Sequence, residues 1–297
     1  MLIAVVLAMA GLCFGSFVNA LVWRLHMQQT PVKKPSRSRS INGRLSASIR
    51  LVLKYHSRSR YSILWGRSMC PNCRHELAPT DLVPVVSWVL LHGKCRYCSQ
   101  PISWQYPAVE LLLPVLFVLS YVWWPLGFSA GSTFSFGLWL IFLTAFVALG
   151  IYDLRWFILP DRIVYPLVGL ALLEIIIRAT AFGGGWRLVI MAFWGVFFLA
   201  GLFGAFYVIS RGAWIGFGDV KLAVVLGLLV GGPLMALLLV FLASVFGSIL
   251  AVPLLIKGWA KPTTQIPFGP FLLVATVVVV MFGNHISDWY SSFLYLR

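Results

Sequence analysis

Two parts of the sequence place carboxylates at the edges of long apolar runs, within residues 152–161 and residues 216–221. The chain has only eight acidic residues, and a carboxylate at membrane depth is costly, so its presence there points to function. Two carboxylates that converge can share one proton and activate a water molecule. We therefore predict that Asp153 and Asp219 form the catalytic pair of an aspartyl protease. The alternative interpretation is that both residues cap helices at the water interface.

Four neighbouring residues could support this pair. Gly216 and Gly218 have no Cβ atom, so backbone or substrate can approach Asp219 closely. Asp161 follows a proline at the start of an apolar run, where we expect it to cap the helix, with direct catalysis as the other interpretation. We expect Lys221 to extend toward the lipid headgroups, although it could also pair with a charge or with substrate.

Four cysteines form a second candidate site. Two Cys-x-x-Cys pairs, with 21 residues between them, have the spacing of a structural zinc site. Four thiolates complete a tetrahedral coordination sphere, so this metal would be structural rather than catalytic. Reduced cysteines or redox disulfides are the alternative, and a reducing cytosolic location disfavours structural disulfides. The predicted ligands are Cys70, Cys73, Cys95 and Cys98, and the nearby His75 and His92 are not needed.

Long apolar segments must position these residues. The chain is 60% hydrophobic and only 10% charged, and repeated apolar runs of about 18 residues indicate a polytopic membrane protein. We predict an all-α membrane fold of about eight transmembrane helices with one cytosolic zinc-knuckle loop domain. The sixth span should be short or broken, because two glycines and a proline follow it at residues 231–233. The expected spans are 2–23, 106–124, 134–152, 163–179, 188–210, 222–230, 234–256 and 271–282.

The distribution of basic residues predicts the orientation in the membrane. With the N-terminus outside, the loops at 24–104, 153–162, 210–221 and 257–268 are cytosolic and carry 20 of the 23 Lys and Arg residues. The positive-inside rule strongly favours this orientation over its inverse. It places both aspartates and both cysteine pairs on the cytosolic side. We expect the basic loop to attract anionic membrane lipids, and we expect no nucleic-acid partner because the loop has no recognised nucleic-acid module.

The chain divides by composition into three expected domains. Residues 1–23 form the first transmembrane helix, residues 24–104 the basic cytosolic loop domain, and residues 105–297 the transmembrane protease core. In the loop, residues 30–60 are rich in Ser, Arg and Lys and are interpreted as poorly ordered or lying at the membrane surface. A short amphipathic helix is expected at 49–53. Asn19, within the first span, is expected to form an ordinary interhelical hydrogen bond.

Taken together, these motifs resemble the bacterial type IV prepilin peptidases, a leader peptidase/N-methyltransferase family of intramembrane aspartyl proteases. By this resemblance Asp153 and Asp219 match the catalytic pair, and the chain lies in the bacterial inner membrane. Members cleave the short basic leader of type IV prepilins and pseudopilins, in type IV pilus and type II secretion systems. They then methylate the new N-terminal amine from S-adenosylmethionine. That cofactor is implied by the resemblance alone, because the sequence has no Gly-x-Gly-x-x-Gly loop. The matching motifs lie at residues 15–19, 70–73, 81–88, 93–98, 106–110, 153–161, 216–219 and 267–270.

Three other functions compete with this interpretation. A presenilin-like intramembrane aspartyl protease acting on other substrates would share the Gly-x-Gly-Asp motif, but it would not explain the cysteine loop. A transporter with a proton relay should place its acids nearer the bilayer midplane and show internal repeats. A non-catalytic zinc-bearing membrane scaffold would leave the aspartate pair unexplained.

Overall fold

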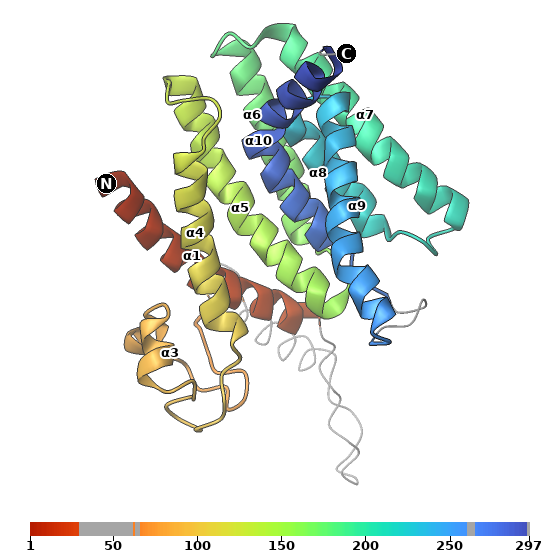
Figure 1. Cartoon of the computed structure of the whole chain (residues 1–297). Helices are drawn as coiled ribbons and strands as arrows, with labels where there is room; N and C mark the ends of the chain where they lie inside the picture. The colour runs from red at the N-terminus through yellow and green to blue at the C-terminus, as the bar shows by residue number, and fades with distance from the viewer. Residues whose placement is uncertain (30–61, 63–65, 260–264, 296–297) are drawn as a thin grey trace, which may run out of the picture. The chain divides into compact units, whose positions relative to one another are not determined.

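The regular secondary structure in the described part of the chain is helical (Figure 1). In this computed structural model the described residues are 1–29, 62, 66–259 and 265–295. The segment expected to be poorly ordered, and the amphipathic helix expected at 49–53, lie outside these residues. The chain forms two compact units, Met1–Phe117 and Val118–Arg297, and each is described by itself. The predicted three-domain division stays a prediction.

The first unit packs two long helices closely. Helix α1 (Leu2–Gln29) runs six residues beyond the predicted end of span 1, and α4 (Gln105–Val122) begins in this unit. A Cβ atom on Gly11 would lie 2.4 Å from the Pro114 Cα, and one on Gly15 would lie 2.6 Å from the Glu110 Cα. Small residues of this kind allow helix backbones to approach each other in membranes. The expected interhelical bond of Asn19 is confirmed, because its side-chain amide donates to the Tyr106 carbonyl at 3.0 Å.

The connection between α1 and α4 contains two short helical pieces in its described part. The 3-10 helix η1 (Pro79–Leu82) and the helix α3 (Val86–Leu90) follow the first cysteine pair. The second cysteine pair comes after α3, and Trp88 on α3 packs against Trp104, with ring centroids 4.2 Å apart. These pieces form the framework of the predicted loop domain.

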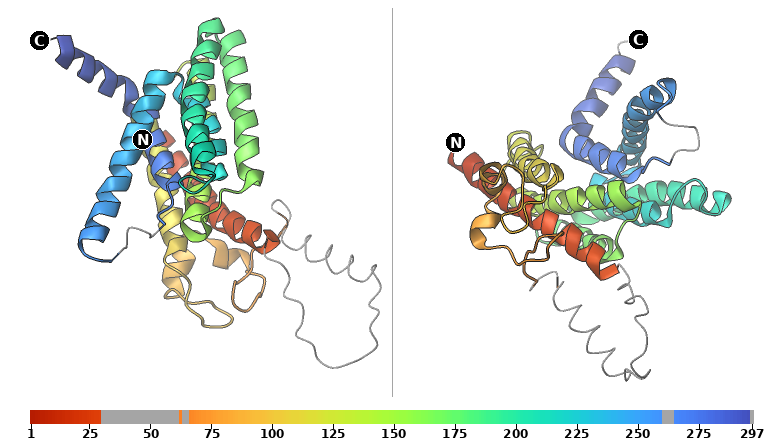
Figure 2. Two further views of the ribbon diagram at one scale, coloured as in Figure 1. Left: turned by 90° about the vertical axis from the view of Figure 1, so that its right-hand side faces the viewer. Right: turned by 90° about the horizontal axis from the view of Figure 1, so that it is seen from below.

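The second unit contains six helices, which run beside one another in two perpendicular views (Figure 2). The short helix α8 contacts four of its neighbours, α6, α7, α9 and α10. Its packing on α7 is close: a Cβ atom on Gly195 would lie 2.5 Å from the Gly227 carbonyl oxygen. Leu222 and Leu226 of α8 are fully buried. The six helices are α5 (Ala130–Trp156), α6 (Asp161–Thr180), α7 (Gly185–Ser210), α8 (Phe217–Val230), α9 (Pro233–Ile256) and α10 (Gly269–Tyr295).

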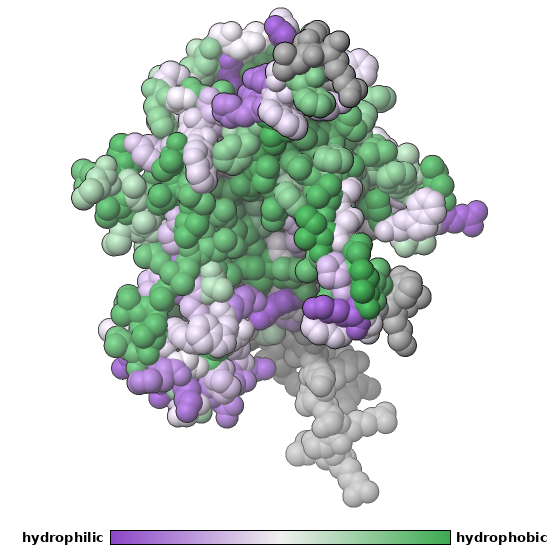
Figure 3. Space-filling model, viewed as in Figure 1, coloured by the Kyte–Doolittle hydropathy of each residue, from purple (hydrophilic) through white to green (hydrophobic). Residues whose placement is uncertain are grey.

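The length and composition of the helices support a multi-pass membrane protein. Among the described residues, seven helices are long and apolar enough to cross a membrane. The remaining predicted span, the sixth, is α8, which has only 14 residues and is therefore short, as expected. Large apolar side chains such as Val208 and Ile249 are more than half exposed, and a lipid environment accounts for them. Figure 3 shows hydrophobic side chains along the helices and hydrophilic ones gathered at their ends and over the cysteine loop.

Candidate functional site

The two predicted catalytic aspartates come from helix ends that meet in the second unit. Asp153 lies in the last turn of α5, and Asp219 is the third residue of α8. The third participant is Gly269, the first residue of α10. Helix α10 packs against both α5 and α8, which is why residues at least 50 positions apart can converge.

Gly269 lies close to both carboxylates. A Cβ atom built on Gly269 would be 2.4 Å from Asp153 Oδ2 and 3.7 Å from Asp219 Oδ1. Because these two distances share one endpoint, the two oxygens are at most about 6 Å apart. The Gly269 backbone N–H donates a hydrogen bond to the Asp153 carboxylate. The aspartates are therefore close enough to act on one substrate bond, and only a glycine fits between them.

The helix termini give the two acids different surroundings. Asp219 lies in the first turn of α8 and accepts a hydrogen bond from the N–H of the N-cap residue Gly216. Helix capping therefore explains the position of Asp219 in part. Asp153 lies near the C-terminus of α5, where the helix dipole disfavours an anion, and it is only 6% exposed. Capping therefore does not explain Asp153. The free N–H groups at the start of α10 compensate in part, because helix N-termini attract anions.

Asp161 and Lys221 form an ion pair that joins the starts of α6 and α8. The expectation that Asp161 caps its helix is wrong, because Pro160 is the N-cap residue and no side chain caps this terminus. Of the roles considered for Lys221, the charge pair is observed, since its ammonium donates to Asp161. The ammonium also lies 5.7 Å from the centroid of the Tyr165 ring. An ion pair between residues 60 positions apart cannot be deduced from local spacing.

The glycines near Asp219 do not share one role. A Cβ atom on Gly218 would come within 3.3 Å of the Leu159 Cβ, so Gly218 lets the α5–α6 turn pack against α8. Gly216 has an ordinary φ of −74°, and a Cβ atom there would only make normal contacts, the nearest at 3.8 Å. Sequence reasoning missed Gly269 as a site residue. The available signal was its motif at residues 267–270, where a glycine stands between a phenylalanine and a proline.

The four cysteines of the first unit converge as predicted. Their sulfur atoms all lie within 4.8 Å of one another, and the Cys70 and Cys98 sulfurs are 3.9 Å apart. Tetrahedral zinc–thiolate bonds of about 2.3 Å place sulfurs about 3.8 Å apart. All four thiols are free of disulfide bonds. This geometry fits a single metal ion held by Cys70, Cys73, Cys95 and Cys98.

The two cysteine pairs are structural copies of one another, offset by 25 residues. In the first copy the Cys70 N–H donates to the His75 carbonyl at 3.0 Å, and in the second the Cys95 N–H donates to the Gln100 carbonyl at 2.9 Å. The same offset relates their bridges, from Met69 to Glu76 and from Lys94 to Pro101. Each turn thus presents two sulfurs on one side. The His75 imidazole forms a hydrogen bond outside the cysteine cluster, because its Nδ1 atom lies 2.7 Å from the Glu76 carbonyl oxygen.

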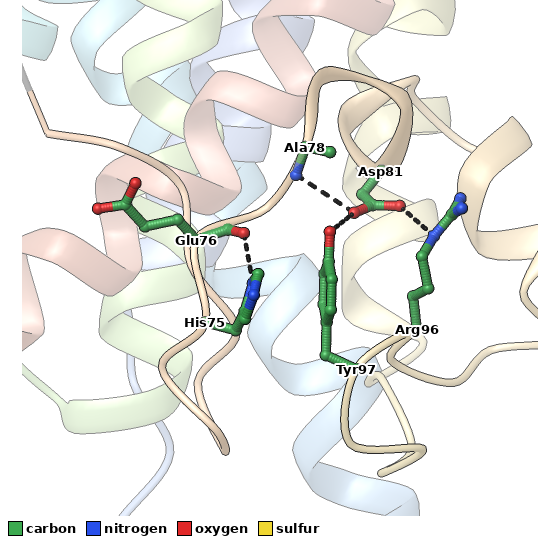
Figure 4. Close-up of polar contacts among 6 residues, drawn as sticks. All are labelled: His75, Glu76, Ala78, Asp81, Arg96 and Tyr97. Carbon is green, nitrogen blue, oxygen red and sulfur yellow. Dashed lines mark hydrogen bonds and ion pairs between the residues drawn. The ribbon is translucent and has the colours of Figure 1, made fainter.

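Asp81 stabilises the cysteine loop through contacts with three residues (Figure 4). Its carboxylate accepts hydrogen bonds from the Ala78 N–H at 3.2 Å and the Tyr97 hydroxyl at 3.0 Å, and it forms an ion pair with Arg96 at 2.8 Å. The hydrogen bond to Asp81 raises the pKa of Tyr97. Because Arg96 and Tyr97 lie between the second pair of cysteines, these contacts hold that turn against η1.

Comparison with known families decides the assignment. Residues 9–124 match the bacterial peptidase A24 N-terminal domain, and residues 140–252 match the type IV leader peptidase family. The chain belongs to the type IV leader peptidase family. The resemblance found in the sequence is thereby confirmed, and the chain is a peptidase.

Curated relatives extend the match over almost the whole chain. A protein of Pseudomonas aeruginosa named prepilin leader peptidase/N-methyltransferase is 32% identical over 95% of this chain and 91% of its own length. A protein of the same name from Stutzerimonas stutzeri is 31% identical over 95% of this chain and 92% of its own. The Bacillus subtilis protein of that name is 28% identical over 77% of this chain and 87% of its own. No solved structure matches the chain.

Proposed function

We propose that this chain removes the leader peptide of type IV prepilins and pseudopilins and then N-methylates the newly exposed residue. The observation that carries the proposal is the convergence of Asp153 and Asp219 on Gly269. The printed name of the relatives, prepilin leader peptidase/N-methyltransferase, supports both activities. Asp153 and Asp219 act as the catalytic pair, while Asp161, Gly216, Gly218 and Lys221 support it.

Peptide hydrolysis by this pair needs one ionised and one protonated carboxyl group. The ionised aspartate takes a proton from water as the oxygen attacks the scissile carbonyl, and the protonated aspartate donates to the carbonyl oxygen. As the tetrahedral intermediate collapses and the C–N bond breaks, the leaving amine receives a proton from the pair, and a hydroxyl group of the intermediate returns its proton to the pair. The two carboxyl groups end with the single proton they began with, so the cycle needs no other group.

The position of the pair suits a single-span substrate. Both aspartates lie within a turn of helix termini, and the charge distribution supports an inner-membrane orientation with the N-terminus outside and the cysteine loop in the cytosol. A substrate whose basic leader stays in the cytosol and whose apolar segment enters the bilayer would present its junction at this depth. The basic loop would attract anionic lipids near the site.

Two cofactors follow from the proposal. Cys70, Cys73, Cys95 and Cys98 would hold a structural zinc ion, which links the two halves of the loop and leaves no coordination position for catalysis. S-adenosylmethionine would supply the methyl group for the second reaction. The residues that bind it belong to no recognised sequence motif and are addressed below.

Incubation of the purified full-length protein with a prepilin-like peptide tests the proposal. The peptide carries a basic leader followed by an apolar segment, and the product masses are read with and without S-adenosylmethionine. We expect cleavage in both reactions and one added methyl group only with the methyl donor. Uncleaved peptide after incubation with protein that holds one metal ion per chain would contradict the proposed protease. Cleavage without methylation would contradict only the second activity.

A further inference from the structure

The first unit contains a cleft that the proposed proteolysis does not use. It lies between α1, the start of α4 and the cysteine loop, and its interior of about 130 Å³ opens to solvent. Its lining combines buried polar groups with aromatic rings, and the residues that matter here are Asn19, Arg24, Trp88, Tyr106 and Glu110.

The buried polar groups of this cleft point to a ligand. The Asn19 amide nitrogen donates to Tyr106, but its Oδ1 atom is buried with no hydrogen-bond partner among the described residues. Such an unsatisfied acceptor is costly and calls for a donor. Glu110 is 8% exposed and Arg24 is 7% exposed, so a carboxylate and a guanidinium are held in the same cleft. An acidic side chain such as Glu110 is rarely buried to this degree without a specific reason.

The Val85 N–H and the Ser16 side chain fix the position of Glu110. The Val85 N–H donates to the Glu110 Oε2 atom at 2.8 Å, and the Ser16 side chain also donates to the carboxylate. Val85 adopts a positive φ of 61°, a conformation that is strained for a β-branched residue and that aims its N–H at Glu110. None of the ion pairs among the described residues involves Glu110. A cationic group of a ligand could therefore complete its coordination.

An indole ring supplies a flat apolar surface in the same cleft. Trp88 lines it, and the indole N–H donates to the Ile102 carbonyl at 3.3 Å, which fixes the ring. Gly93 supports the back of this ring, because a Cβ atom there would lie 3.0 Å from it, and Gly93 also needs its positive φ of 69°. Nucleic-acid bases stack readily on such rings. Trp104 already packs against Trp88, with ring centroids 4.2 Å apart, so an aromatic heterocycle would contact the part of the indole that lines the cleft.

We propose that this cleft binds the methyl donor, S-adenosylmethionine. This inference rests on the N-methyltransferase part of the proposed function. The donor has a carboxylate for Arg24, an ammonium group for Glu110 and the Asn19 Oδ1 atom, and an adenine ring for Trp88. No lining residue belongs to the aspartate pair, so proteolysis and methylation use different sites. In the transfer, the substrate amine forms the new N–C bond, the C–S bond breaks with its electrons retained on sulfur, and the amine releases one proton to solvent.

Direct binding by the purified full-length protein tests the site. Calorimetric titration with S-adenosylmethionine should show saturable binding to the wild-type protein. Glu110→Gln keeps the size of the side chain and its ability to accept from Val85, but it removes the charge. Arg24→Gln removes the cation. Each loses a charge-assisted hydrogen bond and should weaken binding about tenfold or more, while leader cleavage persists.

A matched buried acid in the other unit provides the control. Glu174 is 9% exposed and lies on α6, so Glu174→Gln should bind the methyl donor as the wild type does. Unchanged affinity in both Glu110→Gln and Arg24→Gln, with methylation intact in the wild type, would overturn the cleft assignment. Absence of binding and of methylation in a wild-type protein that cleaves would overturn the cleft together with the methyltransferase proposal.

Photocrosslinking gives an independent map of the same site. Ultraviolet irradiation with radiolabelled S-adenosylmethionine should label peptides from residues 1–29 or 66–117, and unlabelled donor in excess should abolish the labelling. Labelling confined to peptides of residues 130–295 would contradict the inference, whatever the effect of the substitutions.

Discussion

Asp81 in the cysteine loop and the aspartate pair of the helix bundle have opposite surroundings. In the loop, Asp81 has two hydrogen-bond donors and the Arg96 cation (Figure 4). In the bundle, Asp153 and Asp219 face each other across Gly269, and none of the ion pairs among the described residues includes either one. A carboxylate saturated with donors and a cation holds structure together, whereas a close pair of carboxylates with few donors can exchange protons. We therefore propose that the same residue type serves stability in one region and chemistry in the other.

The largest effect is expected when proton exchange between Asp153 and Asp219 in the bundle is removed. Asp153→Asn and Asp219→Asn keep the size of each side chain but lose general acid–base function, which typically costs about 10²–10⁴-fold in rate. Because the two residues act as a unit, the double variant should be little worse than either single variant. Rates of leader cleavage for the three proteins would show this. Multiplication of the two single effects would mean that the residues act independently.

The next largest effect should come from the residue between the two carboxylates. Gly269→Ala places a methyl group 2.4 Å from Asp153 Oδ2, so the carboxylate must move away from Asp219. We expect a loss of leader cleavage of at least about tenfold, since small displacements in a catalytic site are costly. Gly137→Ala on α5 is the matched control, because a Cβ atom there would meet nothing within 4 Å. Equal activity of both variants would show that the spacing of the pair is not critical.

In the cysteine loop, the corresponding test removes two of the proposed metal ligands rather than an acidic side chain. Cys70→Ser with Cys95→Ser takes one ligand from each copy of the turn, and we expect about one zinc ion per chain in the wild type and none in this variant. Limited proteolysis should then cut within residues 66–104 much faster, while the helices of the second unit remain protected. The prediction is wrong if wild-type protein kept reduced throughout purification holds no metal.

The smallest effect is expected at the Asp161–Lys221 ion pair, which lies beside the proposed catalytic pair. Asp161 is an acid beside the catalytic site, but it already has the Lys221 cation as its partner. Since its side chain is 53% exposed, Asp161→Asn should change stability by no more than about 1 kcal/mol and leave most of the cleavage activity. Thermal unfolding and the cleavage rate would measure both. Inactivity as complete as that of the Asp219 variant would make Asp161 a third catalytic residue.

Much of the fold follows from the sequence, because long apolar runs in a membrane have few alternatives to helices. The predicted spans fall on the helices observed, and the glycines and proline at 231–233 correctly indicate that α8 is short. The errors lie at the helix ends: α1 continues to Gln29, and α10 to Tyr295. Polar and aromatic residues there lower the apolar signal without ending the helix.

The sites were predictable to the extent that their residues are rare or regularly spaced. Four cysteines in two pairs specify one cluster, and scarce acids at span ends identify Asp153 and Asp219. Gly269 and the Asp161–Lys221 pair depend on how α6, α8 and α10 pack, and local spacing carries no information about that. The cleft with its unsatisfied Asn19 oxygen likewise requires α1 and α4 to be side by side.

The most direct test of the central claim, that Asp153 and Asp219 act as a pair, is leader cleavage by Asp219→Asn beside the wild type and Asp161→Asn. The three proteins are compared at equal concentration, with folding checked by metal content and thermal unfolding. We predict at least a hundredfold loss for Asp219→Asn and a far smaller loss for Asp161→Asn. Cleavage by well-folded Asp219→Asn at near the wild-type rate would contradict the assignment of the pair.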